Sequence, residues 1–329
     1  MSIFHTTDIS SKSFLVTGGA GFIGSHITEY LLRHGAGKVT VLDNLSTGFQ
    51  KNIDLFTGYS QFRFIEGDIR DYDTCMKACE GIDHVTHQAA LGSVPRSVKD
   101  PVTSNAVNVD GQLNMLTAAK EQGVKTFVYA SSSSVYGDEP NLPKHEERTG
   151  NPLSPYAVTK KTNELYADVF GKLYGMKIAG LRYFNVFGPR QDPDGPYAAV
   201  IPLFVSGILK QTPVYINGDG EQTRDFTFVD NAVQANIRAM LAENDSAFGK
   251  AYNVAVGENF SVNLLYRSIR EMLGKENEHE ATYREEREGD IRNSLADISR
   301  ATEFLGYQPT KRFMDGLAQT VDFFKELYS

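Results

Sequence analysis

Thr17-Gly18-Gly19-Ala20-Gly21-Phe22-Ile23-Gly24 is the stretch that decides the fold of this 329-residue chain. Residues 13–17 form a short, apolar, β-rich run before the turn, and a helical pattern continues after it to His34. A buried strand that turns through glycines into a helix begins a parallel βα unit. The first, third and fourth glycines are three residues apart, which permits a tight turn, close approach of a pyrophosphate and packing of the helix on the strand. The stretch therefore predicts a dinucleotide site.

A carboxylate after the next predicted strand supports this interpretation. Residues 38–42 form that strand, and Asp43 follows it, 19 residues after Gly24. At this place a carboxylate accepts hydrogen bonds from the adenosine ribose and repels the 2′-phosphate of NADP. No arginine follows within residues 44–47, so the sequence predicts NAD as the cofactor.

Strand and helix patterns continue to alternate toward the middle of the chain. Predicted strands cover residues 62–68, 84–87 and 126–130, and predicted helices cover residues 71–79 and 105–122. This alternation indicates the α/β class with a doubly wound parallel (Rossmann) sheet, whose ligands bind at the carboxyl ends of the strands. Candidate site residues follow three of those ends: Asp68-Ile69, Gln88-Ala89-Ala90 and Ser131-Ser132-Ser133-Ser134.

Tyr156 and Lys160 lie four residues apart at the start of a predicted helix. At this spacing both side chains leave the same helical face, so a phenol and an ammonium can point into one cleft. A nearby cation favours the phenolate and lowers the pKa of a tyrosine from its usual value of about 10. The pair is therefore a candidate base for proton transfer.

Composition and charge exclude several classes of protein. Hydrophobic residues make up 41% and charged residues 22%, which is ordinary for a globular protein. The net charge of −8 disfavours binding to nucleic acid or to an anionic membrane. No apolar run approaches about 20 residues, the length that spans a bilayer, and residues 1–8 lack the features of a secretory signal. We expect a cytoplasmic protein.

The cysteines and histidines show no pattern of metal ligands. Cys75 and Cys79 lie four apart on a predicted helix and are expected to be reduced. His84 and His87 lie three apart on a predicted strand, so they face opposite sides. We expect no metal.

Several stretches together resemble the extended short-chain dehydrogenase/reductase family, in its nucleotide-sugar epimerase and dehydratase branch. Residues 88–97 look most like epimerases that interconvert UDP-N-acetylglucosamine and UDP-N-acetylgalactosamine. The matching stretches occur in the family's order: residues 17–24, His87-Gln88-Ala89-Ala90, Ser131-Ser132-Ser133-Ser134-Val135-Tyr136-Gly137, Tyr156 with Lys160, and Leu181-Arg182-Tyr183-Phe184-Asn185-Val186-Phe187-Gly188-Pro189.

The resemblance implies a reaction and a role for each catalytic residue. NAD would accept a hydride from carbon 4 of a UDP-hexose while Tyr156 takes the 4-hydroxyl proton. The 4-keto sugar would turn over and receive the hydride on its other face. Lys160 would modulate the tyrosine and bind the nicotinamide ribose. Ser132, with Ser133 as an adjacent second candidate, would hydrogen bond to the reacting oxygen.

The predicted cofactor site combines the glycine turn with the strand ends and the tyrosine helix. Its residues are Gly18, Gly21, Phe22, Ile23, Gly24, Asp43, Asn44, Ser46, Thr47, Gly48, Asp68, Ile69, Gln88, Ala89, Ala90, Asn108, Tyr156, Lys160 and Tyr183.

The regular alternation breaks up after about Pro189. Residues 1–189 are expected to form mainly the NAD-binding domain, and residues 190–329 mainly a smaller lobe that binds the nucleotide sugar. Residues 228–257 contain a predicted helix and a predicted strand, which we expect to return to the large domain.

The resemblance also implies a substrate site in this lobe. Arg224 and Arg287 match arginines that clamp the diphosphate, as bidentate guanidinium groups suit phosphate oxygens. Asp290 matches a ribose ligand, and Asn185 matches a contact to the diphosphate and sugar. The expected uracil pocket contains Ala199, Val200 and Tyr215.

Ser294 determines the predicted substrate preference. Family members restricted to plain glucose and galactose commonly carry a bulky aromatic residue at the matching place, whereas a serine leaves room for a 2-acetamido group. Gly92 and Ser93 would form the opposite wall, and the catalytic candidate Ser132 would also contact the substrate. We therefore expect a UDP-N-acetylhexosamine as substrate.

Several alternatives stay open. The substrate could also be UDP-glucose/galactose or a UDP-uronic acid, with the same 4-epimerase reaction. A 4,6-dehydratase is disfavoured because the family's dehydratases carry an Asp-Glu pair where this chain has Ser133 and Ser134, and a hydroxyl cannot replace a carboxylate as base near neutral pH. The missing glutamate also disfavours a glucuronate decarboxylase. A non-catalytic module would be expected to lack the tyrosine or the lysine, and a net dehydrogenase would need an external redox partner.

The resemblance also implies a homodimer. Such proteins often pair through helices that match residues 105–122 and 156–174 of this chain.

Overall fold

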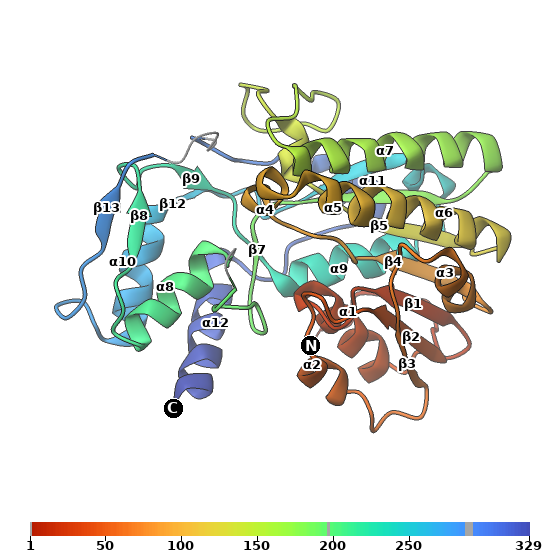
Figure 1. Cartoon of the computed structure of the whole chain (residues 1–329), viewed down its shortest axis with the longest axis horizontal. Helices are drawn as coiled ribbons and strands as arrows, with labels where there is room; N and C mark the ends of the chain where they lie inside the picture. The colour runs from red at the N-terminus through yellow and green to blue at the C-terminus, as the bar shows by residue number, and fades with distance from the viewer. Residues whose placement is uncertain (1, 196–197, 287–291) are drawn as a thin grey trace.

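The computed structural model describes residues 2–195, 198–286 and 292–329, and its main feature is one parallel sheet (Figure 1). The strand order is β11-β6-β5-β4-β1-β2-β3, and every neighbouring pair is parallel. The chain therefore winds outward from β1 in both directions, and the order reverses between β1 and β4, where such sheets bind ligands. This confirms the predicted Rossmann fold. The strands are β1 Ser13–Thr17, β2 Lys38–Asp43, β3 Phe62–Glu66, β4 His84–His87, β5 Thr126–Ser132, β6 Ile178–Tyr183 and β11 Lys250–Val254.

Helices cover both faces of the sheet, because alternate strand residues point to opposite sides. Phe14 and Val16 of β1 join the apolar cluster of α1, α9 and α11, whereas Leu15 joins the cluster of α3, α6 and α7. Strand β1 is thus buried on both faces, as the apolar run predicted. The helices are α1 Phe22–Arg33, α9 Val229–Met240 and α11 Ser299–Leu305 on one side, and α3 Tyr72–Cys79, α6 Gly111–Glu121 and α7 Pro155–Tyr174 on the other.

Helix α7 has clear start and stop signals. The Ser154 hydroxyl accepts a hydrogen bond from the backbone N–H of Ala157, and Pro155 occupies the first turn. Gly175 ends the helix in the left-handed conformation, with φ of 67°. These signals place Tyr156 in the first turn, at the carboxyl edge of the sheet.

The helix expected over residues 105–122 is divided into three parts. An α-helical turn leads into a π-helical turn at Ala106–Asp110, and α6 begins only at Gly111. A π-helical turn inserts one extra residue per turn, and periodicity alone does not reveal it. The remaining short helices are α2 Gln50–Asp54, which packs on the side of α1, and α4 Val94–Lys99 and α5 Pro101–Asn105, which contact α7, with 3₁₀ turns at Ser133–Tyr136 and Asp245–Ala247.

The second half of the chain builds a smaller lobe, on the left in Figure 1, around stacked aromatic rings. Phe226 and Phe260 both stack on Phe313, with ring centroids 5.2 Å and 4.4 Å away. Three helices and three two-stranded sheets surround these rings. The elements are α8 Val200–Leu209, α10 Val262–Leu273 and α12 Phe313–Tyr328, with the pairs β7 Val186–Phe187 and β10 Thr227–Phe228, β9 Thr223–Arg224 and β12 Phe260–Ser261, and β8 Tyr215–Asn217 and β13 Thr282–Arg284.

Helix length and apolar content also bear on membrane insertion. Over the described ranges, no helix combines the length and apolar character needed to span a bilayer.

Cys75 and Cys79 are both buried free cysteines, and burial raises the pKa of each thiol to about 12, so both stay protonated at neutral pH.

Candidate functional site

A cavity of about 350 Å³ opens at the carboxyl ends of β1, β2, β4 and β5. It spans the point where the strand order reverses, and most of the predicted cofactor residues line it. These are Gly18, Gly21, Phe22, Ile23, Gly24, Asp43, Asn44, Ser46, Thr47, Asp68, Ile69, Gln88, Ala89, Ala90, Tyr156, Lys160 and Tyr183, joined by Gly92 of the predicted substrate site.

The glycine turn leaves the backbone open to this cavity. Gly18 has φ of +69°, and a Cβ on it would lie 2.7 Å from the backbone nitrogen of Ala89. A Cβ on Gly24 would lie 2.2 Å from the carbonyl oxygen of Gly18. The first turn of α1 lines the cavity, so its N–H groups and the positive end of the helix dipole suit a pyrophosphate. The cradle therefore fits a dinucleotide.

Asp43 is held at the cavity wall by two backbone donors. Its carboxylate accepts hydrogen bonds from Ala20 N at 2.9 Å and from Leu45 N at 2.8 Å. Burial raises the pKa of the Asp43 carboxyl, although both N–H groups oppose this shift. A carboxylate has about four acceptor sites, so two remain for ribose hydroxyls.

Asp68 forms the neighbouring part of the wall. The Arg70 guanidinium lies 2.6 Å from its carboxylate and holds the pKa of Asp68 at about 2. Asn44 donates a second hydrogen bond, at 2.9 Å. Asp68 is therefore ionised at all physiological pH values, and Asn44 is oriented by it.

The structure brings Tyr156, Ser132 and Lys160 together at the inner end of the cavity. The Ser132 side chain lies close enough to the Tyr156 hydroxyl to lower its pKa. The Lys160 ammonium donates to the carbonyl oxygen of Ala130 at 2.7 Å and lies 5.9 Å from the centre of the Tyr156 ring. The spacing of the pair on α7 thus does place both groups in one cleft.

Burial is the main influence on both ionisable groups. It raises the pKa of the Tyr156 hydroxyl, while the nearby Ser132 side chain acts in the opposite direction. It lowers the pKa of the Lys160 ammonium to about 8, since Lys160 is only 3% exposed. The pKa of Tyr156 is therefore raised, not lowered as the spacing of the pair predicted, because burial outweighs the neighbouring groups. Perturbed pKa values of this kind in a cavity are typical of a functional site.

Tyr183 is fixed by amide side chains at the cavity floor. Its hydroxyl donates to Gln88 at 3.0 Å and accepts from Asn236 at 2.7 Å, and burial raises its pKa. Asn236 lies on α9, far along the sequence, so no local pattern pointed to it. The residues that line the cavity and were missed are Leu42, Gly67, Leu91, Val107 and Ala130, whereas Ser131 belongs to the predicted serine run.

Within the described part of the chain, some predicted residues lie near the cavity but do not line it. Asn108, inside the π-helical turn, donates to Thr159 and accepts from the backbone N–H of Leu91 at 2.7 Å. Ser132 accepts from the backbone N–H of Ser134 at 3.1 Å, at the start of the 3₁₀ turn. Gly48, Ser93 and Ser133 also lie outside the cavity lining, and Ser93 caps α4 through the backbone N–H of Arg96.

A second cavity, of about 710 Å³, lies in the smaller lobe. Asn185, Val200, Tyr215 and Arg224 of the predicted substrate site line it. So does Arg284, which was missed: its guanidinium carbon lies 3.1 Å from the centre of the Tyr215 ring, a cation–π contact.

The remaining predicted substrate residues have different positions. Ala199 is the N-cap of α8 and is not among the described residues that line either cavity. Ser294 is partly buried, and its backbone N–H donates to the carbonyl of Thr223 at 3.1 Å, beside Arg224. Arg287 and Asp290 lie outside the described residues.

Comparisons with known proteins agree with this geometry. The model of the NAD dependent epimerase/dehydratase family matches residues 14–255. The UDP-glucose 4-epimerase of Mycolicibacterium smegmatis is 40% identical over 313 residues, which are 94% of this chain and 98% of that protein.

Two solved structures superpose over nearly the whole chain. One is the UDP-N-acetylglucosamine 4-epimerase of Methanobrevibacter ruminantium in complex with UDP-N-acetylmuramic acid, with a TM-score of 0.89, 41% identity and coverage of 96% and 99% of the two chains. The other is the UDP-glucuronic acid 4-epimerase of Bacillus cereus with UDP-glucuronic acid and NAD, with a TM-score of 0.89, 33% identity and coverage of 96% and 100%.

Proposed function

The chain belongs to the NAD dependent epimerase/dehydratase family, and from this premise we propose that it interconverts UDP-N-acetylglucosamine and UDP-N-acetylgalactosamine. The resemblance noted in the sequence is thereby confirmed, and so is NAD as the cofactor. At the level of reaction class, the protein is an NAD-dependent UDP-sugar 4-epimerase, as are the three relatives described above. The acetamido sugar is the part that we propose.

The observation that carries the proposed mechanism is the placement of Tyr156 and Lys160 in the glycine-lined cavity, with Ser132 close enough to the Tyr156 hydroxyl to lower its pKa. NAD, when bound, supplies a hydride acceptor for carbon 4 of the sugar. Tyr156 is proposed to hold the proton of the 4-hydroxyl, and Ser132 to hydrogen bond to the same oxygen. Both residues would hold the 4-keto sugar until the proton returns.

Lys160 is proposed to favour the ionised tyrosine. An ammonium close to a phenol stabilises the phenolate. Lys160 reaches the cavity from one turn farther along α7, and its hydrogen bond to Ala130 fixes the direction of its side chain. The same ammonium can reach a ribose hydroxyl at the cavity wall.

This chain has serines at the positions where the family's dehydratases carry acidic residues, and this supports epimerisation over dehydration. The side chains after Ser132 are Ser133 and Ser134, in a 3₁₀ turn. The loss of water across carbons 5 and 6 needs a carboxyl pair, which these hydroxyls do not supply near neutral pH.

Ser294 and residues 88–97 support the acetamido sugar over the plain or uronic sugars. Ser294 lies on the segment that is hydrogen bonded to Thr223, next to Arg224 at the substrate cavity.

The purified protein, without added NAD, should convert UDP-N-acetylglucosamine into UDP-N-acetylgalactosamine and accumulate no NADH. A keto product, or turnover of only plain or uronic sugars, would reject this assignment.

Replacing Ser294 with tyrosine should change the substrate ratio. The ring would fill the space that we assign to the 2-acetamido group, so kcat/KM for the acetamido sugar should fall by about 10–100-fold relative to UDP-glucose, the scale at which pocket shape discriminates. Kinetics with both sugars would measure this ratio, and Ser299→Tyr, on the exposed start of α11, is the control. An unchanged ratio would contradict the placement of Ser294.

We also propose that two copies pair through α7 and its neighbours. Val158, Leu165, Val169 and Leu173 fall on one stripe of α7, and Leu165 and Leu173 are 59% and 69% exposed. Val102 of α5 adds a further apolar side chain, 78% exposed. A continuous apolar surface of this kind marks a contact between proteins.

Leu165→Asp should therefore convert the dimer to a monomer. A carboxylate at the centre of an apolar interface costs more free energy than association can return, whereas the same side chain on a free surface is tolerated. Light scattering of the eluting protein would report the molar mass. Leu55→Asp, at another exposed leucine, should leave the mass unchanged. A wild-type monomer, or a dimer that survives Leu165→Asp, would refute the interface.

A further inference from the structure

The carboxylate of Glu164 joins three elements of the large domain at one point. It accepts a hydrogen bond from the Ser131 hydroxyl of β5 at 2.7 Å. It also accepts two from Arg182 of β6, at 2.8 Å from Nε and 2.9 Å from Nη2. The side chains of Arg182 and Glu164 are only 5% and 11% exposed, so this fork-like ion pair is nearly buried.

Glu164 lies on the same face of α7 as the two residues with the proposed proton chemistry. Tyr156, Lys160 and Glu164 follow one another at intervals of four residues, so the three side chains form one row. Lys160 attaches this row to Ala130 of β5, and Glu164 attaches it to the next residue, Ser131. The helix is thus tied twice to the strand that carries Ser132.

We propose that Glu164 and Arg182 are a positioning pair, which holds the Tyr156 hydroxyl and the Ser132 hydroxyl at the spacing that proton transfer requires. The inference rests on the proposed function of Tyr156 and Ser132 and adds two residues that neither touch the sugar nor line the cofactor cavity.

Energetics favour a geometric role over a stabilising one. A buried ion pair gains little free energy of folding over an apolar pair of similar size, because both charges lose their water. What it does supply is direction: a planar guanidinium and a carboxylate meet in one orientation. A displacement of about 1 Å at reacting groups can reduce a rate by about 10²-fold, so such orientation matters at this place.

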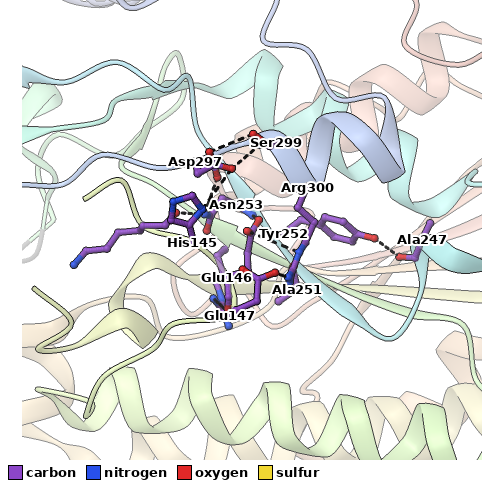
Figure 2. Close-up of polar contacts among 12 residues, drawn as sticks. His145, Glu146, Glu147, Ala247, Ala251, Tyr252, Asn253, Asp297, Ser299 and Arg300 are labelled. Carbon is purple, nitrogen blue, oxygen red and sulfur yellow. Dashed lines mark hydrogen bonds and ion pairs between the residues drawn. The ribbon is translucent and has the colours of Figure 1, made fainter. Parts of the chain in front are cut away.

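The pair also belongs to a longer buried network, whose outer part is shown in Figure 2. Arg182 donates to the Tyr136 hydroxyl at 3.1 Å, and that hydroxyl donates to the Asn253 side chain at 2.6 Å. Asn253 in turn donates to the carbonyl of Asp297 at 2.9 Å and from its backbone to Glu146 at 2.8 Å. The network thus extends from β5 to the segment that carries Ser294.

Four variants of the full-length enzyme test the proposal. Glu164→Gln keeps the shape and removes the charge, and Glu164→Asp keeps the charge on a shorter side chain. Ser131→Ala removes one hydrogen bond and leaves the ion pair intact. Asp168→Asn is the matched control, one turn farther along α7, where Asp168 forms an exposed ion pair with Lys172 at 2.6 Å.

The measurements are kcat, KM, Tm and the pH dependence of kcat/KM, with the UDP-sugar that the wild-type enzyme turns over fastest. We expect kcat to fall about 10–100-fold in Glu164→Gln and about 3–10-fold in Ser131→Ala, with KM within about 3-fold. Glu164→Asp should recover part of the loss, and Asp168→Asn should match the wild type. The interaction with Ser132 lowers the pKa of Tyr156. If Glu164→Gln and Ser131→Ala weaken this interaction, the acidic limb of their kcat/KM profiles should move to higher pH.

The structural alternative predicts a different pattern. If the pair only stabilises the fold, both Ser131→Ala and Glu164→Gln will keep kcat per folded molecule within about 2-fold of the wild type at temperatures well below Tm. Their pH profiles will not move either. That result would overturn the proposal. Wild-type turnover of another UDP-sugar would reject the acetamido assignment alone, because these comparisons do not depend on which sugar is used.

Discussion

Replacing Tyr156 with phenylalanine is expected to lower kcat by about 10²–10⁴-fold, the usual contribution of a positioned acid or base. The change removes one oxygen and keeps the ring, so the interaction with Ser132 is lost while the packing of α7 remains. In the proposed mechanism, the proton of the sugar 4-hydroxyl then loses its acceptor. KM for the UDP-sugar should change by less than about 3-fold, because we propose that the nucleotide is bound by the smaller lobe.

Initial rates of UDP-sugar interconversion would measure this loss, and Tyr166→Phe provides the control. Tyr166 lies on the same helix and is 36% exposed. Its variant should retain wild-type kcat and Tm. Full activity of Tyr156→Phe would remove the tyrosine from the mechanism, and a loss shared by both variants would indicate damage to the helix instead.

Lys160→Met is expected to lower kcat by about 10–10³-fold near pH 7, since a neighbouring cation shifts a tyrosine pKa by about 1–3 units. Methionine fills a similar volume, but it cannot donate to the carbonyl of Ala130 or stabilise a phenolate. NAD retained after purification should also decrease, because the ammonium is proposed to bind the ribose. The matched control is Lys161→Met, which changes the next residue along the helix and removes its hydrogen bond to Thr149.

The pH dependence of kcat/KM distinguishes the effect of the Lys160 charge from the effect of its packing. Burial lowers the pKa of Lys160 to about 8, so the ammonium is present below that pH and is lost as the pH rises through it. Wild-type kcat/KM should therefore decline above about pH 8. Lys160→Met has no cation to lose and should show no such decline. A wild-type profile that keeps rising through pH 9 would contradict this role for the lysine.

Much of the large domain could be predicted because its signals are local. The apolar run, the glycine turn and the helix start lie within residues 13–34, and strands and helices continue to alternate through residue 132. The π-helical turn at Ala106–Asp110 was missed, since it is stabilised by contacts with distant parts of the chain, such as the bond between Asn108 and Leu91.

The candidate site was predictable where residues follow strand ends, and less so where tertiary contacts place them. Asp43, Gln88 and Tyr156 line the cavity because the sheet edge brings them there. Asn236 of α9 holds the Tyr183 hydroxyl that lines this cavity, and Arg284 reaches the second cavity by the pairing of β13 with β8. Glu164 and Arg182 lie 18 positions apart, and nothing in their local sequence indicates that they meet.

The position of β11 has a consequence for how this protein is made. The strand beside β6 comes from residues 250–254, after the chain has passed through much of the smaller lobe. While the ribosome is still adding those residues, β6 is an uncovered edge with free N–H and C=O groups, which can pair with other nascent chains. The first 189 residues therefore cannot complete their own sheet, and the two lobes must mature together rather than one after the other.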